Sequence, residues 1–211
     1  MQTTPRIRNS LLLVLGLFVA LFAGMAYLIH LKADENAVDE AKQQAINALL
    51  VHRAIHAYVT HTQRFELSRL QQQQLLYPEY FSAELMSATA ISRKITDLLN
   101  TQRAKQGMEP IYFKLASKNP TNPINQADAL EIDLLQKMNH AGLTRFEDVI
   151  ELDGKKYLYL ALPIERSSAG CLRCHGDPKD APKEMVAEYG DKAGFFEASN
   201  DIRALISIRA P

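Results

Sequence analysis

Two cysteines and a histidine stand close together near the C-terminal end of the chain, as Cys171, Cys174 and His175. Two thiols three positions apart can form thioether bonds to the two vinyl groups of one haem. The imidazole that follows the second thiol can then bind the iron from one side. This C-x-x-C-H spacing is the usual attachment signature of a c-type haem. The motif therefore predicts one covalent haem c, held by Cys171 and Cys174, with His175 as an axial ligand of the iron.

Three other interpretations of the paired cysteines are weaker. A redox dithiol is usually found in a thioredoxin-like βαβ context, which the surrounding sequence does not show. A structural zinc site needs four ligands, whereas this chain has only two cysteines and no spaced pair of histidines after them. A disulfide between Cys171 and Cys174 would close a very small, strained loop. Haem is the favoured interpretation, and a redox or metal site is the alternative.

The composition argues against several classes of function. The chain has 211 residues, with 24 Lys plus Arg and 24 Asp plus Glu, so its formal net charge is zero. This length suits one globular domain with an accessory segment. A neutral chain without a basic run is not expected to bind nucleic acid. No Gly-rich phosphate loop, G-x-S-x-G or H-E-x-x-H motif occurs, and the protein is not expected to be an enzyme.

A long apolar segment near the N-terminus predicts a membrane anchor. Residues 10–31 contain no Asp, Glu, Lys or Arg, and as a helix they would span roughly 33 Å, enough to cross a hydrocarbon core of about 30 Å. Arginines precede the segment and acidic residues follow it, so the positive-inside rule leaves the N-terminus in the cytoplasm. We therefore expect a single-pass protein of the inner membrane whose haem domain lies in the periplasm. A cleaved signal peptide with its small-residue site at 24–26 is the alternative.

The rest of the sequence predicts an α+β fold. A long helix, rich in Ala, Leu and Gln and free of Gly and Pro, is expected over residues 36–74. The Asp153-Gly154 pair between two strand-like runs predicts a hairpin with a two-residue turn, and the C-x-x-C-H motif is expected in the loop after it. The other expected elements are a helix over 82–103, a strand over 111–116, a helix over 128–140, hairpin strands over 145–152 and 156–163, a helix over 180–189 and a strand over 203–209.

These elements suggest four regions along the chain. They are a cytoplasmic N-terminus over 1–9, a transmembrane anchor over 10–31, a long periplasmic helix over 32–76 and a haem-carrying domain over 77–211. A strand, a helix, a hairpin, a loop and a closing strand fit a small antiparallel sheet of the PAS type. The expected architecture is thus an N-terminal transmembrane helix, a long helix, and then a PAS-like antiparallel sheet domain with a c-type haem.

Several segments of the sequence resemble one bacterial family of single-haem domains. The family was long catalogued as a domain of unknown function, and its members occur alone or as the sensing module of membrane histidine kinases and chemotaxis receptors. The run C-L-x-C-H-G-D-P followed by A-P is much more specific than C-x-x-C-H alone. The resemblance covers roughly residues 77–211 and implies a PAS-like fold with one c-type haem. The segments that carry it are residues 118–125, 151–157, 171–178, 181–183 and 206–211.

The second axial ligand of the iron is left open by the sequence. The resemblance places it on the N-terminal helix, where a family member uses a cysteine, but here both cysteines belong to the attachment motif. His52 and His56 are the first candidates, because they share a helical stripe with apolar residues, and we expect a low-spin haem with two histidine ligands. Two ordinary histidines with hydrogen-bond partners are the alternative. Lower in rank are His61, Met86 and Met108, followed by His30 at the membrane boundary and His140 at a helix end.

Three asparagines and two tyrosines of the expected domain are predicted to have structural roles. Asn119, Asn122 and Asn125 lie in a loop dense in Asn and Pro, and we expect them to cap turns, with a place in the haem pocket as the alternative. Tyr157 and Tyr159 alternate with leucines along a strand. We expect the two tyrosines to pack in the core with their hydroxyls at its edge.

Two related functions fit one covalent haem beside a membrane. The protein is expected to be redox-active, either transferring electrons to a redox partner or sensing redox state and acting on a signalling protein. A dimer through the long helix would suit the second role. A gas or small-ligand sensor that acts through a partner protein is the alternative. A haem peroxidase ranks below both, because the sequence identifies no distal acid or base for it.

Overall fold

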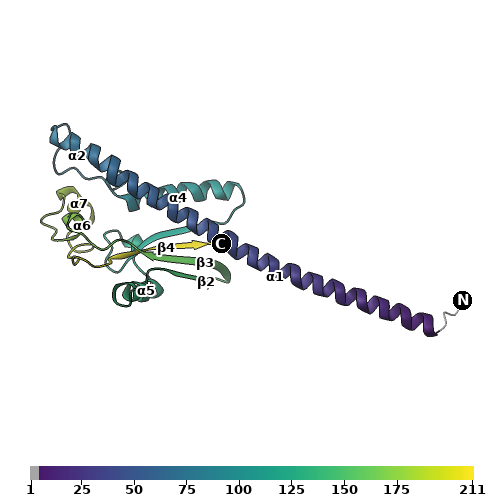
Figure 1. Cartoon of the computed structure of the whole chain (residues 1–211). Helices are drawn as coiled ribbons and strands as arrows, with labels where there is room; N and C mark the ends of the chain where they lie inside the picture. Colours follow the sequence, from purple (N-terminus) through teal and green to yellow (C-terminus); the bar gives the residue numbers. More distant parts are fainter. Residues whose placement is uncertain (1–4) are drawn as a thin grey trace. The chain divides into compact units, whose positions relative to one another are not determined.

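The computed structural model describes residues 5–211. The chain forms two compact units, one that ends at Glu40 and one from Ala41 to Pro211. The second unit contains the β-sheet and the C-x-x-C-H motif, and most of its elements are labelled in Figure 1. The observed mixture of helices and antiparallel strands confirms the α+β class.

The first helix, α1 (Pro5–Tyr58), contains the apolar segment of the sequence. The mean hydropathy of its most apolar window is 2.6, so by length and composition it is able to cross a membrane. A signal sequence near the N-terminus would have the same character. The aliphatic and aromatic side chains of residues 10–31 are all exposed, as expected of a segment whose surroundings are lipid rather than protein.

The helical path continues beyond α1 with one irregular turn. A π-helical segment, Val59–Gln63, joins α1 to α2 (Arg64–Gln72). The helix predicted over 36–74 is therefore confirmed, with a π-bulge inside it. The bulge shifts the buried face of the helix, because one residue is added to the turn.

The buried stripe of α1 includes His52 but not His56. His52 is 6% exposed and follows the buried small residues Ala41 and Ala45, whereas His56 is exposed. The prediction that both histidines share the buried stripe is thus wrong for His56. The reason is helical geometry, since from His52 the stripe proceeds through the half-buried Ile55.

The second unit is built on a four-stranded antiparallel sheet with the order β1-β4-β3-β2. Strands β2 and β3 form the predicted hairpin, in which Leu152 pairs with Lys155. The two turn residues, Asp153 and Gly154, have φ values of 52° and 75°, as a type I′ turn requires. The strands are β1 (Tyr112–Ser117), β2 (Phe146–Leu152), β3 (Lys155–Pro163) and β4 (Ala204–Ala210).

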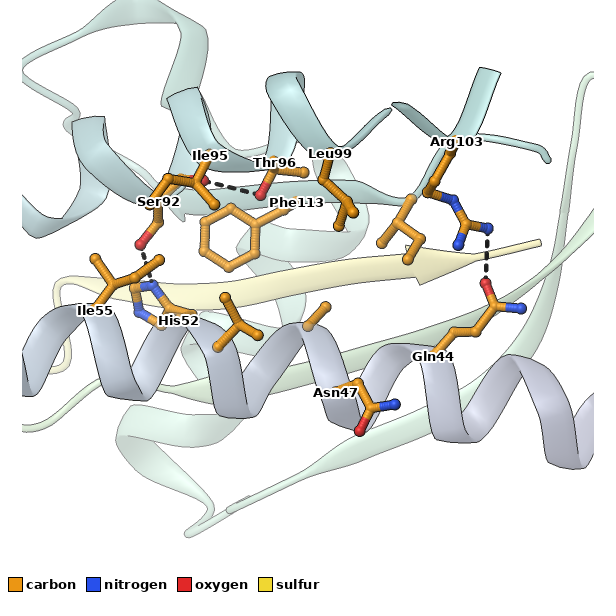
Figure 2. Close-up of a pocket in the computed structure, with 13 residues that line it drawn as sticks. Gln44, Asn47, His52, Ile55, Ser92, Ile95, Thr96, Leu99, Arg103 and Phe113 are labelled. Carbon is orange, nitrogen blue, oxygen red and sulfur yellow. Dashed lines mark hydrogen bonds between the residues drawn. The ribbon is translucent and has the colours of Figure 1, made fainter. Parts of the chain in front are cut away.

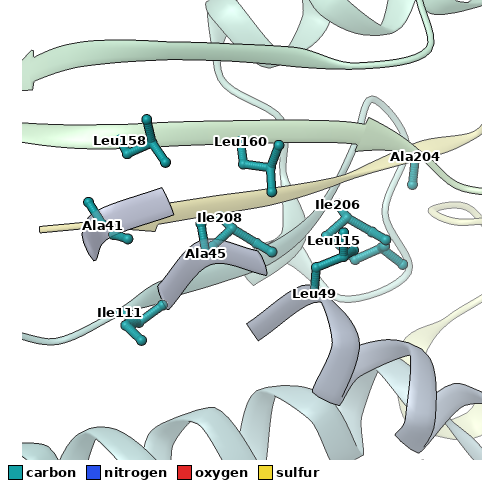
Figure 3. Close-up of a cluster of buried hydrophobic side chains, with 11 residues drawn as sticks. Ala41, Ala45, Leu49, Ile111, Leu115, Leu158, Leu160, Ala204, Ile206 and Ile208 are labelled. Atoms are coloured by element: carbon teal, nitrogen blue, oxygen red, sulfur yellow. The ribbon is translucent and has the colours of Figure 1, made fainter. Parts of the chain in front are cut away.

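Successive side chains along each strand point to opposite faces of the sheet, so each face has its own core. On one face, Leu158 and Leu160 of β3 belong to the same cluster as Ala45 of α1 (Figure 3). Small side chains on α1 let the helix lie close to the sheet. On the other face, the fully buried Tyr159 packs in a cluster with residues of α5 (Ala129–His140). The expectation that Tyr159 is a core residue is confirmed.

Helix α5 is fixed to the sheet by its first turn. The Asp128 carboxylate accepts a hydrogen bond from the Glu131 N–H at 2.9 Å, and the Glu131 carboxylate accepts one from the Asp128 N–H at 2.8 Å, which is a capping box. Glu131 is fully buried, and the Lys114 ammonium on β1 lies 2.6 Å from its Oε2. This buried ion pair connects the start of the helix to the edge strand β1.

The helix predicted over 82–103 is divided in two. It consists of α3 (Ala83–Met86) and α4 (Ala88–Lys105). Ser87 between them has an extended backbone, and its hydroxyl accepts a hydrogen bond from the Ala90 N–H at 3.3 Å. Ser87 therefore begins α4 as an N-cap, a role for which serine is well suited.

The C-x-x-C-H motif is helical, although the sequence analysis expected it in a loop. It lies in α6 (Ala169–His175), and α7 (Lys183–Tyr189) follows it. The Ser168 carbonyl accepts hydrogen bonds from the N–H groups of Cys171 and Leu172, at 2.9 and 3.1 Å. These bonds form the first turn of a helix too short for apolar periodicity to reveal it. A further 3-10 turn is Pro123–Asn125.

Candidate functional site

Helix α6 places both thiols of the motif on one face. Cys171 and Cys174 are three residues apart on a helix, so their side chains are neighbours. Both are half-buried free thiols. Cys174 packs against the buried cluster that contains Met185 and Phe195. Within residues 5–211, no group of three or more His, Cys, Asp or Glu side chains is arranged to hold a metal ion, so the zinc alternative gains no support.

The two thiols differ in acidity. Burial acts to raise the pKa of Cys171, but hydrogen bonds with the Ser168 hydroxyl, 3.4 Å from the sulfur, and with the Ser168 backbone lower it below its ordinary value overall. Burial raises the pKa of Cys174. Cys171 is therefore the more readily ionised of the two thiols, and thus the more reactive one.

His175 is the last residue of α6, and one of its ring nitrogens has a backbone partner. Its Nδ1 lies 2.9 Å from the Gly194 carbonyl oxygen. A carbonyl oxygen only accepts hydrogen bonds, so Nδ1 carries the proton and Nε2 carries the lone pair. Burial, followed by the positive charge of Arg203, lowers the pKa of His175 to about 4. A neutral imidazole with its second nitrogen held by a carbonyl is the usual state of a metal-binding histidine.

The Gly194 carbonyl is itself held in place by Asn119. The Gly194 N–H donates to the Asn119 Oδ1 at 3.0 Å, and the Asn119 Nδ2 donates to the Phe195 carbonyl at 3.0 Å. Gly194 has a φ of 82°, and a Cβ at this position would lie 2.7 Å from the Thr121 Cα. Glycine is therefore required here both by backbone conformation and by space. Asn119, which the sequence analysis assigned to a turn, supports the partner of His175.

Cys174 and His175 line a cavity that the second unit forms beside the sheet. It has about 780 Å³ of space not filled by atoms, part of it open to solvent. Three described arginines line it, Arg64 from α2, Arg93 from α4 and Arg203 just before β4. The apolar part of the lining includes Phe81, Leu115, Met86, Met185 and Tyr189. Such a site suits a large apolar group that carries negative charges.

The comparisons with known proteins identify the family. Residues 34–211, most of the chain, match the family model described as Tll0287-like. The chain belongs to the Tll0287-like family. Among solved structures, that of the cyanobacterial haem protein Tll0287 is 17% identical, and the match covers 75% of this chain and 95% of that one with a TM-score of 0.48. No curated protein matches the chain.

In this Tll0287-like protein the residues predicted as candidates for the second axial ligand of the iron lie in different places. Met86 lines the same cavity as Cys174 and His175. Neither His52 nor His56 is among the described residues that line it. His52 lines a second cavity, where its Nδ1 is 2.9 Å from the Ser92 hydroxyl. The lower-ranked His61, His140 and Met108 are exposed.

The arginines of the cavity were not predicted as site residues from the sequence. Arg64, Arg93 and Arg203 come from three distant parts of the chain, so no local pattern connects them. Burial lowers the pKa of Arg203, although an arginine remains charged at any physiological pH. An arginine that is kept charged in a mostly enclosed place is a signal for an anionic partner, but only the tertiary structure reveals it.

Proposed function

We propose that this protein carries one covalent c-type haem in the cavity beside Cys174 and His175, and that it works in electron transfer or redox sensing. The observation that supports this most is the state of His175. Its Nδ1 is bonded to the Gly194 carbonyl, so its Nε2 is the nitrogen that can bind iron. The thiols on the same short helix match the attachment signature of a c-type haem.

The residues of the cavity fit a haem chemically. A haem has a broad apolar face, two vinyl groups and two propionate carboxylates. Cys171 and Cys174 would hold the vinyl carbons, and the apolar lining would contact the macrocycle. Guanidinium groups pair well with carboxylates, so the three arginines Arg64, Arg93 and Arg203 are suitable partners for the propionates. The same groups would not suit a bare metal ion, because they repel cations.

The bound haem would supply a one-electron couple, and the protein would set its environment. Asn119 and Gly194 orient the His175 ring and keep its proton on Nδ1. The hydrogen bond to a carbonyl increases the electron-donating character of the imidazole. Apolar side chains such as Phe81 and Met185 exclude water from one side of the cavity. No residue in it is assigned a catalytic acid or base role, and we propose that the protein is not an enzyme.

Membrane anchoring and location are part of the proposal. The apolar segment over 10–31, with arginines before it and acidic residues after it, favours a single-pass anchor in the inner membrane with the haem domain in the periplasm. The antiparallel sheet with α5 on one face and α1 on the other is consistent with a PAS-like domain. A redox or signalling protein at the membrane would be the partner.

For the second axial position, the cavity favours Met86. A thioether is an established iron ligand in c-type cytochromes, and Met86 lines the cavity of His175. Its backbone is held in place, because the Arg64 guanidinium donates two hydrogen bonds to the Met86 carbonyl, at 3.1 and 2.9 Å. His52 and His56 remain the alternative ligands. Replacing each of the three residues by alanine in turn identifies the ligand, because only the loss of the true ligand converts a low-spin haem spectrum to a high-spin one.

The central test is covalent attachment. The full chain, produced with a c-type maturation system, is expected to keep its haem after denaturation, and Cys171→Ala or Cys174→Ala should each leave one thioether bond. His175→Ala should retain covalent haem but lose the native spectrum. Complete loss of haem on denaturation of the unaltered chain would refute the proposal. Binding of carbon monoxide or nitric oxide by the reduced protein would favour the ligand sensor over electron transfer.

A further inference from the structure

A second cavity lies between α1 and α4, above strand β1, as Figure 2 shows. It has about 700 Å³ of space not filled by atoms, part of it open to solvent. Ile111 and Phe113 form its base on the sheet side. Apolar side chains of the two helices form its walls, namely Val51, Ile55, Ile95 and Leu99. None of the attachment residues Cys171, Cys174 and His175 lines this cavity.

A hydrogen-bonded pair of polar side chains lies at each end of the cavity, and between them Asn47 and Thr96, whose hydroxyl donates to the Ser92 carbonyl, also line it. At one end the His52 Nδ1 and the Ser92 hydroxyl are 2.9 Å apart. At the other end the Arg103 guanidinium donates to the Gln44 Oε1 at 2.9 Å. Figure 2 shows both bonds, with Phe113 and Leu99 between them. Ser92 and Arg103 are eleven residues apart on α4, so the slot is roughly 16 Å long.

Arg103 is the charged group of the slot. Its Nε donates to the Glu109 carbonyl at 2.8 Å and its Nη2 to Gln44, so two neutral acceptors hold the guanidinium in position. In the part of the chain that the structure describes, no carboxylate is within salt-bridge distance of it. His52 at the far end is buried and neutral at neutral pH. The slot therefore combines one oriented positive charge with a middle part that is lined mostly by apolar side chains.

We propose that this slot binds a monocarboxylate with an elongated apolar body. The carboxylate would pair with the Arg103 guanidinium, whose fork of N–H groups matches two carboxylate oxygens. The apolar body would lie over Phe113 and between the helix walls, towards Ser92. A ligand here would contact α1 and α4 together. The slot and the haem cavity share no lining residue, although His52 of the slot is also an alternative axial ligand.

The test uses the haem-loaded full chain in nanodiscs of zwitterionic lipid, with empty nanodiscs as the blank. The probe is 4-phenylbutanoate, and 4-phenylbutanol is the uncharged analogue of the same shape. Isothermal titration calorimetry measures both. The carboxylate is expected to bind at least about tenfold more tightly than the alcohol, because the alcohol lacks the charge-assisted hydrogen bonds to arginine. Octanoate, measured beside it, distinguishes an alkyl acid from an aryl acid as the preferred class.

Two variants and one control test whether Arg103 binds the carboxylate. Arg103→Gln should weaken 4-phenylbutanoate at least about tenfold and leave the alcohol unchanged. Leu99→Glu, at a half-exposed position one turn before Arg103, should weaken 4-phenylbutanoate by supplying a carboxylate within the helix, and it should also weaken the alcohol because Leu99 belongs to the apolar wall. Lys105→Gln, which removes a charge outside the lining, is the control and should bind normally. Equal binding of acid and alcohol, absence of binding to the unaltered chain, or normal binding by Arg103→Gln would each overturn the proposal.

Discussion

Asn119 and His175 share one backbone partner, Gly194. The Gly194 N–H donates to Asn119 at 3.0 Å, and the Gly194 carbonyl accepts from His175 at 2.9 Å. The two side chains therefore hold opposite sides of the same residue. Since Asn119 also donates to the Phe195 carbonyl, the acceptor that fixes the His175 ring is held in place by a residue 75 positions earlier in the chain.

Replacement of Asn119 by alanine is expected to loosen His175 without removing any ligand. The change removes two hydrogen bonds, which together correspond to about 2 kcal/mol of stability. A weaker bond from Nδ1 makes the imidazole a poorer electron donor, so the reduction potential of the haem should become more positive. Potentiometric titration of the variant and the unaltered protein measures this. Asn100→Ala is the matched control, because Asn100 makes the same pair of side-chain bonds, with the N–H and carbonyl of Ile111, and does not line the cavity of His175. An unchanged potential in Asn119→Ala would refute the assigned role.

Gly194 is expected to tolerate alanine much less well than Gly190. Both have positive φ values, 82° and 80°, so each alanine variant loses about 1–3 kcal/mol through backbone strain. Only at Gly194 does the added Cβ meet the backbone of Thr121, while the space at Gly190 is open. Thermal unfolding should therefore show a clearly lower Tm for Gly194→Ala than for Gly190→Ala, together with an altered haem spectrum. Equal Tm values would show that the close approach to Thr121 is easily relieved.

Lys114 and Lys137 allow a comparison of a buried ion pair with an exposed one. Lys114 pairs with the fully buried Glu131 at 2.6 Å, and Lys137 pairs with the half-exposed Asp133 at 2.7 Å. Lys114→Met leaves the buried carboxylate with only the more distant Arg209, 3.8 Å from its Oε1, and should lower the free energy of unfolding by about 3 kcal/mol. Lys137→Met should change it by less than about 0.5 kcal/mol. Urea unfolding followed by circular dichroism compares the two, and similar losses would contradict the burial argument.

His52 is expected to make the protein less stable as the pH falls. Burial, followed by the charges of His56 and Arg53, lowers its pKa from 6.5 to about 4. The unfolded chain therefore binds a proton at higher pH than the folded one, and the stability present above pH 6.5 is lost as the pH falls towards 4. Between pH 7 and pH 5 this loss is about 2 kcal/mol.

Substitution tests this pH dependence directly. His52→Gln should reduce the loss of stability between pH 7 and pH 5, because glutamine does not titrate and can still bond to Ser92. His56→Gln, at the exposed position one turn further on, should retain most of it, because burial is the largest cause of the lowered His52 pKa. Urea unfolding at both pH values is the measurement. A pH dependence that is the same in His52→Gln as in the unaltered chain would show that His52 is not its source.

The sequence by itself determined the features that depend on neighbouring residues. The apolar run over 10–31 and the C-x-x-C-H motif are read directly, and the Asp153-Gly154 turn follows from its need for two positive φ values. The helix over 128–140 was also predictable, since an acidic N-cap with a glutamate three residues later is a local signal. These features arise from forces that act within one or two turns of the chain.

Only the tertiary structure decided how distant residues meet. The arginines at 64, 93 and 203 line one cavity because α2, α4 and the start of β4 converge there. His52 is buried beside Ser92 while His56 is exposed, since the orientation of α1 against the sheet selects one face of the helix. The state of His175 depends on a carbonyl 19 residues away and on Asn119. The C-x-x-C-H motif is thus local in sequence, but the surroundings that tune its histidine are produced by packing across the whole domain.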